Sequence, residues 1–271
     1  RNYKVQTVVK QIALLVGRAA LLGLLVLAGV YVLDHARHPS EIAQLFSLKQ
    51  IHYQGLTQLD REGLDSLIFQ TVSKDLLFID LDRVRALVES ESWVKEATIR
   101  RKLPDGLLIH VIERQAVAVA AIDAELYVVD QEGVILDRPS SRHPPVDRPI
   151  VKGLKNVARE NAREENAVRM GTYLRVLREL TLYNPSIAEI DVDKPNSVVV
   201  ILEGDPVPVY LGDRDYLARY ETFISQKELY DQLKKEYGII EFVDVSYDDK
   251  IIFHTPQGKE KTVTAPANDR S

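Results

Sequence analysis

The chain has 271 residues, of which 45% are hydrophobic and 28% charged, a composition typical of globular proteins rather than disordered ones. It contains no cysteine, which excludes disulfide bonds, thiolate zinc sites and thiol catalysis. The first 33 residues hold four basic residues and no acid, whereas the rest holds 31 basic and 40 acidic residues and lacks the net positive charge that favours nucleic-acid binding.

An apolar run, IALLVGRAALLGLLVLAGVYVL, covers residues 12–33 and predicts a transmembrane helix. At 1.5 Å per residue it would extend roughly 33 Å, enough to cross the hydrocarbon core of a bilayer. Arg18 lies toward one end of the run, from where its side chain can extend to the membrane surface. A cleaved signal peptide is the alternative, but its apolar core would be shorter, and LDHARHP is a poor cleavage site.

The basic residues before the apolar run predict the orientation of the helix. Loops rich in Lys and Arg stay in the cytoplasm, so residues 1–11 are expected to form a cytoplasmic N-terminal segment. Everything after Leu33 is then expected outside the cytoplasm. The sequence therefore predicts a single-pass membrane protein with an extracytoplasmic folded part.

Residues 46–114 predict a small α+β domain in the order strand, helix, helix, strand, strand. Gly106 is expected to supply a positive φ in the turn between the last two strands. Trp93, the only tryptophan, follows the second helix and is expected to be largely buried, packing with Leu87 and Val88. The five segments are 45–55, 59–72, 81–93, 94–103 and 106–114.

Residues 115–254 predict a second domain, a mostly antiparallel sheet with two helices. The helices are expected near 156–183 and at 215–237, where apolar residues recur among charged ones. From Thr255 the chain is polar, and residues 255–271 are expected to form a disordered tail. The strand-like runs are AVAVAAI, ELYVVDQEGVILD, IAEIDVD, SVVVILEG, PVPVYLGD, IIEFVDVSY and KIIFH.

No residue pattern in the sequence indicates catalysis. There is no phosphate-binding glycine loop, no nucleophile elbow and no zinc-binding helix motif. Being three residues apart, His35 and His38 would share a face if this segment were helical, but no third ligand is near them in the sequence. The stretch GDRD is interpreted as a turn followed by a helix cap, Asp213 or Asp215, rather than as a metal loop. We expect no catalytic, cofactor-binding or metal-binding residues, although plentiful carboxylates leave a carboxylate-pair hydrolase as an open alternative.

The stretch DLLFIDLDRVRALVESESWVKEATIRRKLPDGLLIHVIER, residues 75–114, resembles the POTRA domain of the FtsQ/DivIB family of bacterial cell-division proteins. ELYVVDQEGVIL, VYLGDRDYLARYETF and EFVDVSY follow in the order found in the second domain of that family. The resemblance implies a single transmembrane helix, a POTRA domain and an FtsQ-type β domain. It also implies a non-enzymatic scaffold of the division machinery in the bacterial inner membrane, at the division site.

The same resemblance implies the partners of the protein. They would be single-pass coiled-coil division proteins of the FtsB/DivIC and FtsL types, bound outside the membrane, with other division proteins at the POTRA domain. Inner-membrane lipid would surround the helix, and no nucleic acid is expected. The alternative is a POTRA-type chaperone module for outer-membrane protein assembly or secretion.

The expected partner site is the last strand of the second domain. The polar chain after it leaves nothing in the sequence to cover its edge, and an open edge can receive a partner's strand. The resemblance points to the same strand, and core packing is the alternative for its apolar side chains. The expected partner-binding residues are Tyr247, Lys250, Ile251, Ile252, Phe253 and His254.

Fusion of reporters after Ser271 tests the expected orientation. A reporter that is active only outside the cytoplasm should be active there, because the folded part follows an N-in helix. A reporter that is active only in the cytoplasm should be silent at the same position. A mature N-terminus found between Leu33 and Glu41 would instead demonstrate a cleaved signal peptide.

Overall fold

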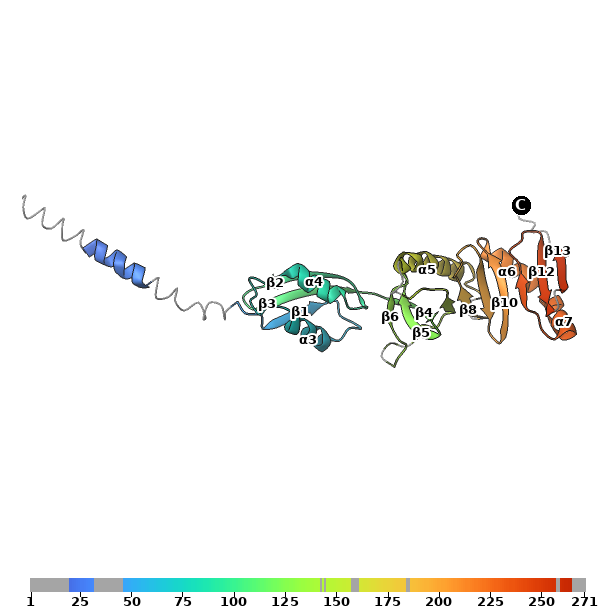
Figure 1. The fold of residues 1–271 in the computed structure, drawn as a ribbon, viewed down its shortest axis with the longest axis horizontal. Coiled ribbons are helices and arrows are strands. Elements are labelled where there is room, and N and C mark those ends of the chain that lie inside the picture. The colour runs from blue at the N-terminus through green and yellow to red at the C-terminus, as the bar shows by residue number, and fades with distance from the viewer. Residues whose placement is uncertain are drawn as a thin grey trace, which may run out of the picture. The chain divides into compact units, whose positions relative to one another are not determined.

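The computed structural model describes residues 20–31, 46–141, 143, 145–156, 161–183, 186–256 and 259–264. The chain divides into two compact units (Figure 1). The first comprises Arg1–Ser90 and Glu96–Ile112, and the second comprises Glu91–Lys95 and Glu113–Ser271.

Residues 20–31 form a helix that exposes its side chains, including those of its leucines. Among the described residues, no helix has the length and apolarity needed to cross a bilayer. The predicted span over residues 12–33 extends past both ends of this helix into positions outside the described residues. The span and its orientation therefore stay predictions, and residues 1–11, His35 and His38 also lie outside the described residues.

The first unit contains the predicted strand-helix-helix-strand-strand domain. Its three strands have the order β1-β3-β2, and β1 pairs parallel to β3. The helices bury the side chains that recur at helical spacing, such as Leu64, Ile68, Val84 and Val88. The elements are β1 (Gln50–Gln54), α3 (Arg61–Thr71), α4 (Leu81–Glu89), β2 (Val94–Lys102) and β3 (Gly106–Glu113).

Gly106 does not have the conformation that its sequence context predicts. It is not among the glycines with positive φ, and it is the first residue of β3. A Cβ at this position would lie 3.3 Å from the carbonyl oxygens of both Gln50 and Lys102. Glycine is therefore favoured here because two backbones approach closely, and not because the turn needs a positive φ.

The second unit is built on a ten-stranded sheet in the order β13-β12-β11-β10-β9-β8-β7-β4-β5-β6 (Figure 1). Most neighbours are antiparallel, and the parallel pairs are β4 with β7, β7 with β8, and β10 with β11. The predicted α+β fold is thus confirmed for both units. The strands are β4 (Ala116–Ile122), β5 (Glu125–Asp130), β6 (Ile135–Asp137), β7 (Ile150–Lys152), β8 (Ile187–Asp191), β9 (Val198–Leu202), β10 (Asp205–Gly212), β11 (Phe242–Asp244), β12 (Lys250–Thr255) and β13 (Lys259–Thr264).

Three helices, rather than the two predicted, pack on this sheet. They are α5 (Ala162–Glu179), α6 (Tyr216–Ser225) and α7 (Lys227–Tyr237). The helix predicted over residues 215–237 is interrupted at Gln226, whose φ of −106° and ψ of 18° are not helical. The break directs two aromatic side chains, Phe223 from α6 and Tyr230 from α7, into one edge-to-face contact in the core, with ring centroids 5.7 Å apart.

The expectation of a disordered tail from Thr255 is wrong for residues 259–264. Thr255 is the last residue of β12, and Lys259–Thr264 forms β13, which pairs with all six residues of β12. Hydrogen bonding to an existing strand lets this polar segment form a strand, because the ladder itself satisfies its backbone groups. Residues 265–271 and 257–258 lie outside the described residues.

A buried ion pair joins Arg114, near the beginning of the second unit, to the first hairpin of that unit. Arg114 and Asp130 are 8% and 3% exposed, and the guanidinium donates to the carboxylate at 2.6 Å. The other oxygen of Asp130 accepts from the backbone amides of Glu132 and Val134, which shapes the turn. Hydrogen bonds from Lys95 and then from Arg114 lower the pKa of Glu132 to about 2.

Trp93 is buried as predicted, with 8% of its surface exposed. Its ring packs against the imidazole of His143, with centroids 4.4 Å apart and planes inclined by 32°. Its backbone carbonyl accepts a hydrogen bond from the amide of Arg114. Trp93 thus contributes both packing and a backbone contact at the start of the second unit.

Replacing Trp93 tests this packing. Truncation of a large buried aromatic side chain typically costs about 3–5 kcal/mol, so Trp93→Ala should markedly lower the melting temperature of the purified chain. Trp93→Phe is the matched control, because it keeps an aromatic ring and should lose much less. Equal melting temperatures for Trp93→Ala and the wild type, measured by circular dichroism, would contradict the packing.

Candidate protein-binding site

The residues expected to bind a partner lie together at the C-terminal end of the sheet. Tyr247 lies in the connection between β11 and β12, and Lys250 to His254 belong to β12. β12 is not the open edge that the sequence predicted, because β11 flanks it on one side and β13 on the other. The last strand of the sheet at this end is β13.

The side chains of β12 alternate between the two faces of the sheet. Ile251 and Phe253 are fully buried and belong to the core of the second unit. Ile252 is 9% exposed, and His254 is half-buried with its ring stacked on Phe242 at a centroid distance of 3.8 Å. The imidazole Nδ1 of His254 also lies 3.4 Å from a carboxylate oxygen of Glu260 in β13.

Tyr247 is the most accessible of the predicted site residues. It is 45% exposed, and the ammonium group of Lys250 lies 4.4 Å from the centre of its ring. That geometry is a cation–π contact, which fixes the ring next to the beginning of β12. The side chains of Tyr247 and Lys250 are therefore at least partly accessible, whereas those of Ile251 and Phe253 are not.

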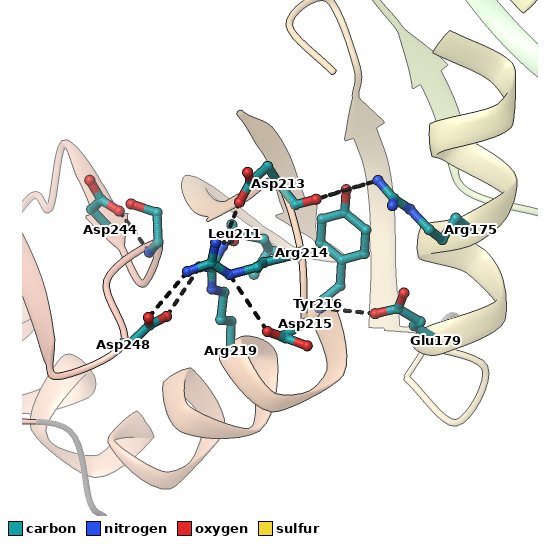
Figure 2. Close-up of polar contacts among 11 residues, drawn as sticks. Arg175, Glu179, Leu211, Asp213, Arg214, Asp215, Tyr216, Arg219, Asp244 and Asp248 are labelled. Carbon is teal, nitrogen blue, oxygen red and sulfur yellow. Dashed lines mark hydrogen bonds and ion pairs between the residues drawn. The ribbon is translucent and has the colours of Figure 1, made fainter. Parts of the chain in front are cut away.

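Arg219 holds the β11–β12 connection in place, and sequence reasoning missed it. It comes from α6, is 6% exposed, and donates to the backbone carbonyl of Leu211 at 2.7 Å. It also donates to the carboxylate of Asp248 at 3.3 Å and lies 3.6 Å from that of Asp213. Figure 2 shows the guanidinium group of Arg219 between α6 and the connection that carries Asp248.

A pattern in the sequence could have revealed Arg219. It lies on the same face of α6 as Tyr216, Tyr220 and Phe223, all of which are buried. A charged residue within the apolar face of an amphipathic helix needs a buried partner, because burial of an unpaired charge is costly. The pattern YLARYETF therefore predicts a buried charge contact, although it does not identify the acid.

A second arginine strengthens the contact with Asp248. Arg214 donates to the other carboxylate oxygen of Asp248 at 3.2 Å (Figure 2). The hydrogen bond from Arg219 and the positive charge of Arg214 hold the pKa of Asp248 below its ordinary value. Asp248, the residue after Tyr247, is thus charged at neutral pH. Its contact with Arg219 joins the β11–β12 connection to α6.

Gly212 makes room for this arrangement. Its φ is +79°, and a Cβ there would lie 2.3 Å from a guanidinium nitrogen of Arg219 and 3.0 Å from the Cβ of Ser246. No side chain fits without moving Arg219 or the connection after β11. Gly212, the first residue of the GDRD stretch, is therefore required for two reasons. Its φ is positive, and there is no room for a side chain.

Neither aspartate predicted to cap α6 does so with its side chain. Asp215 is at the cap position but makes no side-chain cap hydrogen bond, and Asp213 faces Arg219. The carboxylate of Glu179, from the end of α5, accepts from the amide of Tyr216 at 2.9 Å instead (Figure 2). A residue distant in sequence thus supplies the acceptor, which local reasoning could not identify.

The charged and polar groups around the β11–β12 connection pair with one another and hold the backbone of that connection in place. Asp213 and Asp248 face arginines, and the carboxylate of Asp244 accepts from the amide of Ser246 at 2.9 Å. In the part of the chain that the structure describes, no group of three or more His, Asp or Glu side chains is arranged to hold a metal ion. The geometry is that of a rigid support for the exposed Tyr247 and the end of the sheet.

Two family models match the chain, one for each folded unit. The model described as POTRA domain, FtsQ-type, matches residues 46–114. The model described as cell division protein FtsQ/DivIB, C-terminal, matches residues 118–246. The second match ends just before Tyr247, so β12 and β13 lie beyond it.

Curated relatives agree with these matches. The chain is 27% identical over 233 residues to a cell division protein FtsQ of Koribacter versatilis, covering 83% of this chain and 65% of that protein. It is 26% identical over 257 residues to an FtsQ of Geotalea daltonii, covering 93% of this chain and 89% of the relative. An FtsQ of Syntrophotalea carbinolica is 25% identical over 218 residues, covering 79% and 76%.

The two matched domains, in this order, define the class of protein: a POTRA domain followed by an FtsQ-type β domain. The chain belongs to the FtsQ/DivIB family of cell-division proteins. The resemblance found in the sequence is thereby confirmed.

Substitution of Gly212 tests the support around Arg219. Gly212→Ala should lower the melting temperature because the new Cβ displaces the guanidinium of Arg219. Gly204→Ala is the matched control: its φ of +71° is similar, but nothing lies within 4 Å of the added Cβ. The control should lose only the cost of a non-glycine residue at positive φ, roughly 1–2 kcal/mol. Both melting temperatures would be measured by thermal denaturation. Equal decreases in the two variants would contradict the requirement for a close approach between Gly212 and Arg219.

Proposed function

We propose that this protein is a non-enzymatic, single-pass scaffold of the bacterial division machinery that binds partners by accepting a β-strand at the C-terminal end of its sheet. Membership of the FtsQ/DivIB family supports the role in division. The main support for this binding mode is the contrast between two paired strands. β12 is packed into the core, whereas β13 is polar and mostly exposed. The partners would be division proteins of the FtsB/DivIC and FtsL types, bound on the extracytoplasmic side of the inner membrane.

β12 is an integral part of the domain. Ile251 and Phe253 are fully buried, and the backbone of β12 pairs with β11 over three residue pairs. Phe253 also packs near Tyr230 of α7, with ring centroids 6.4 Å apart. Because β12 is paired with β11 and packed against α7, it would keep its position if β13 were replaced.

β13 contributes little packing of its own. Glu260, Lys261, Thr262 and Thr264 are exposed, and Val263 is the side chain that packs partly against the core. Cross-strand pairs contribute roughly 0.2–1 kcal/mol each, so a polar strand of six residues is held mainly by its backbone hydrogen bonds. An extended segment from a partner can make the same backbone hydrogen bonds.

A partner strand can improve on β13 at a definable position. Lys261 is opposite Phe253 and Val263 is opposite Ile251, so these positions share the core face of the sheet. Full burial of a valine, leucine or phenylalanine side chain contributes about 1.5–3 kcal/mol. A partner strand with an apolar residue in place of Lys261 would therefore be favoured over β13.

The outer edge of β13 is a poorer place for a partner to add. Its sequence, KEKTVT, places two lysines and a glutamate along that strand. Charged side chains on edge strands, lysines above all, oppose strand addition. The proposed mode is therefore replacement of β13 on β12, with Tyr247, Lys250, Ile252 and His254 next to the incoming strand.

Other parts of the assignment are proposed on the family resemblance. The POTRA domain would bind further division proteins, and the location would be the inner membrane at the division site with a cytoplasmic N-terminus. The matches reported above give no support to the alternative of a chaperone module for outer-membrane proteins.

A disulfide lock tests the replacement of β13. Ile252 and Thr262 are directly opposite each other, and the chain contains no cysteine, so Ile252→Cys with Thr262→Cys can form one defined bond. The oxidised full chain should lose binding to the extracytoplasmic part of the FtsB/DivIC-type protein from the same organism. Reduction should restore binding, because β13 is released.

The matched control is a lock placed elsewhere in the same sheet. Ala121 and Leu126 are opposite each other in the β4–β5 hairpin, so Ala121→Cys with Leu126→Cys should form a disulfide without affecting binding. Binding would be measured by calorimetry on both oxidised and reduced chains. An oxidised Ile252–Thr262 lock that still binds at wild-type strength would mean that the partner docks elsewhere.

A further inference from the structure

One end of the POTRA domain exposes three large apolar side chains. Leu77, Phe78 and Leu103 are 47%, 82% and 60% exposed. Exposed apolar groups gathered at one place indicate an interaction surface, whereas isolated ones need no explanation.

Backbone contacts place these residues at the same end of the domain. The side chain of Arg101 donates to the carbonyls of Leu76 and Ile79 at 2.8 and 2.6 Å, which ties the end of β2 to the loop holding Leu77 and Phe78. Leu103 follows directly after β2. The three apolar side chains therefore belong to one surface, here called the POTRA tip.

The chain enters the POTRA domain at this tip. The carbonyl of Phe46 accepts from the amide of Leu76 at 2.9 Å, and the amide of Leu48 donates to the carbonyl of Lys74. On its other side, the same segment donates from the amide of Lys49 to the carbonyl of Asp105. Residues 46–49 thus lie between the loop with Phe78 and the β2–β3 turn with Leu103.

Four basic residues lie in the segments that form the tip. Lys49, Lys74 and Lys102 are exposed there, next to Arg101. Acids lie at this end as well. Asp75 accepts from the backbone amide of Leu77 at 3.2 Å, Asp80 accepts from the amides at the start of α4, and Asp105 is in the β2–β3 turn. The four basic residues exceed these three acids by one charge, whereas the whole chain has a net charge of −5.

Exposed apolar side chains beside exposed lysines fit a lipid surface. Phenylalanine and leucine partition into the boundary between headgroups and acyl chains, and lysines attract anionic headgroups. The 14 residues between 31 and 46 span at most about 50 Å when fully extended, so the tip stays within reach of a membrane that holds the N-terminal helix. The apolar surface adjoins the point where the chain enters the domain from the N-terminal helix. Contact with the membrane explains that position, whereas a protein partner could bind anywhere on the domain.

We propose that the POTRA tip, formed by Leu77, Phe78 and Leu103, inserts into the headgroup region of the membrane that anchors the chain, with Lys49, Lys74 and Lys102 against anionic headgroups. This inference rests on the membrane anchoring included in the proposed function. It is independent of the strand exchange at β12. It gives the POTRA domain a fixed orientation on the bilayer.

Site-specific fluorescence in vesicles tests this contact. The full chain would be reconstituted into vesicles of phosphatidylethanolamine and phosphatidylglycerol, with Phe78→Cys carrying a polarity-sensitive fluorophore. The label should shift to shorter wavelength and should be quenched by a spin label attached to the lipid headgroups. Since the chain contains no other cysteine, the label reports one position.

Ile112→Cys is the matched control, because Ile112 is also exposed, at 45%, and lies near the far end of β3 from Gly106. Its label should be neither shifted nor quenched. Quenching should also be lost from Phe78→Cys when Lys49, Lys74 and Lys102 are all changed to Glu. Unchanged quenching in that variant would overturn the role of the lysines.

Flotation of the vesicles separates this proposal from the one on which it rests. A chain that does not float with the vesicles would overturn the anchor, and the tip contact with it. A floating chain with an unquenched label at position 78, or with equal quenching at positions 78 and 112, would overturn the tip contact alone. No partner protein is present, so partner binding at β12 does not affect the result.

Discussion

The C-terminal part of this protein depends on one constraint: the backbone groups of the last strand in a sheet need hydrogen-bonding partners. At one end of the ten-stranded sheet the constraint is mild, because β6 has only three residues. At the other end β12 is twice as long and carries fully buried side chains, so its free edge would be a strong template for another chain. β13 satisfies that edge with a polar sequence that adds little packing, and the proposed function has a partner strand replace it there.

Strand exchange at β12 requires that the rest of the corner stay rigid. Arg219 provides that rigidity by joining the end of β10, through Leu211, to the β11–β12 connection, through Asp248. The contact is possible only because Gly212 leaves space for the guanidinium. A buried arginine with several acceptors is costly to leave unpaired, so the acids around it are better explained by support of the backbone than by chemistry on a substrate.

The two units present different kinds of surface. The β domain ends in a ladder of backbone groups flanked by Tyr247 and Lys250, which suits an extended peptide. The POTRA domain presents exposed apolar side chains beside exposed lysines, next to the segment where the chain enters the domain. The proposed scaffold role would use both surfaces, one to orient the protein relative to the lipid and one to bind other proteins.

The sequence alone determined much of this fold, because periodicity records which face of each element is buried. The helical spacing of Leu64 and Ile68, and the alternation along GLLIHVIE, predicted the POTRA elements in their correct order. Of the residues that the sequence proposed for partner binding, Lys250 to His254 lie in β12, and Tyr247 lies in the connection before it. It could not predict β13, because KEKTVT has almost no apolar pattern and becomes a strand only through its ladder with β12.

Tertiary structure likewise decided the details that depend on distant residues. The acceptor for the start of α6 is Glu179, from α5, and not the adjacent Asp213 or Asp215. The acids that pair with Arg219 come from two separate connections. Local sequence records propensity and burial, whereas the choice of hydrogen-bonding partner depends on which backbones the folded chain brings together.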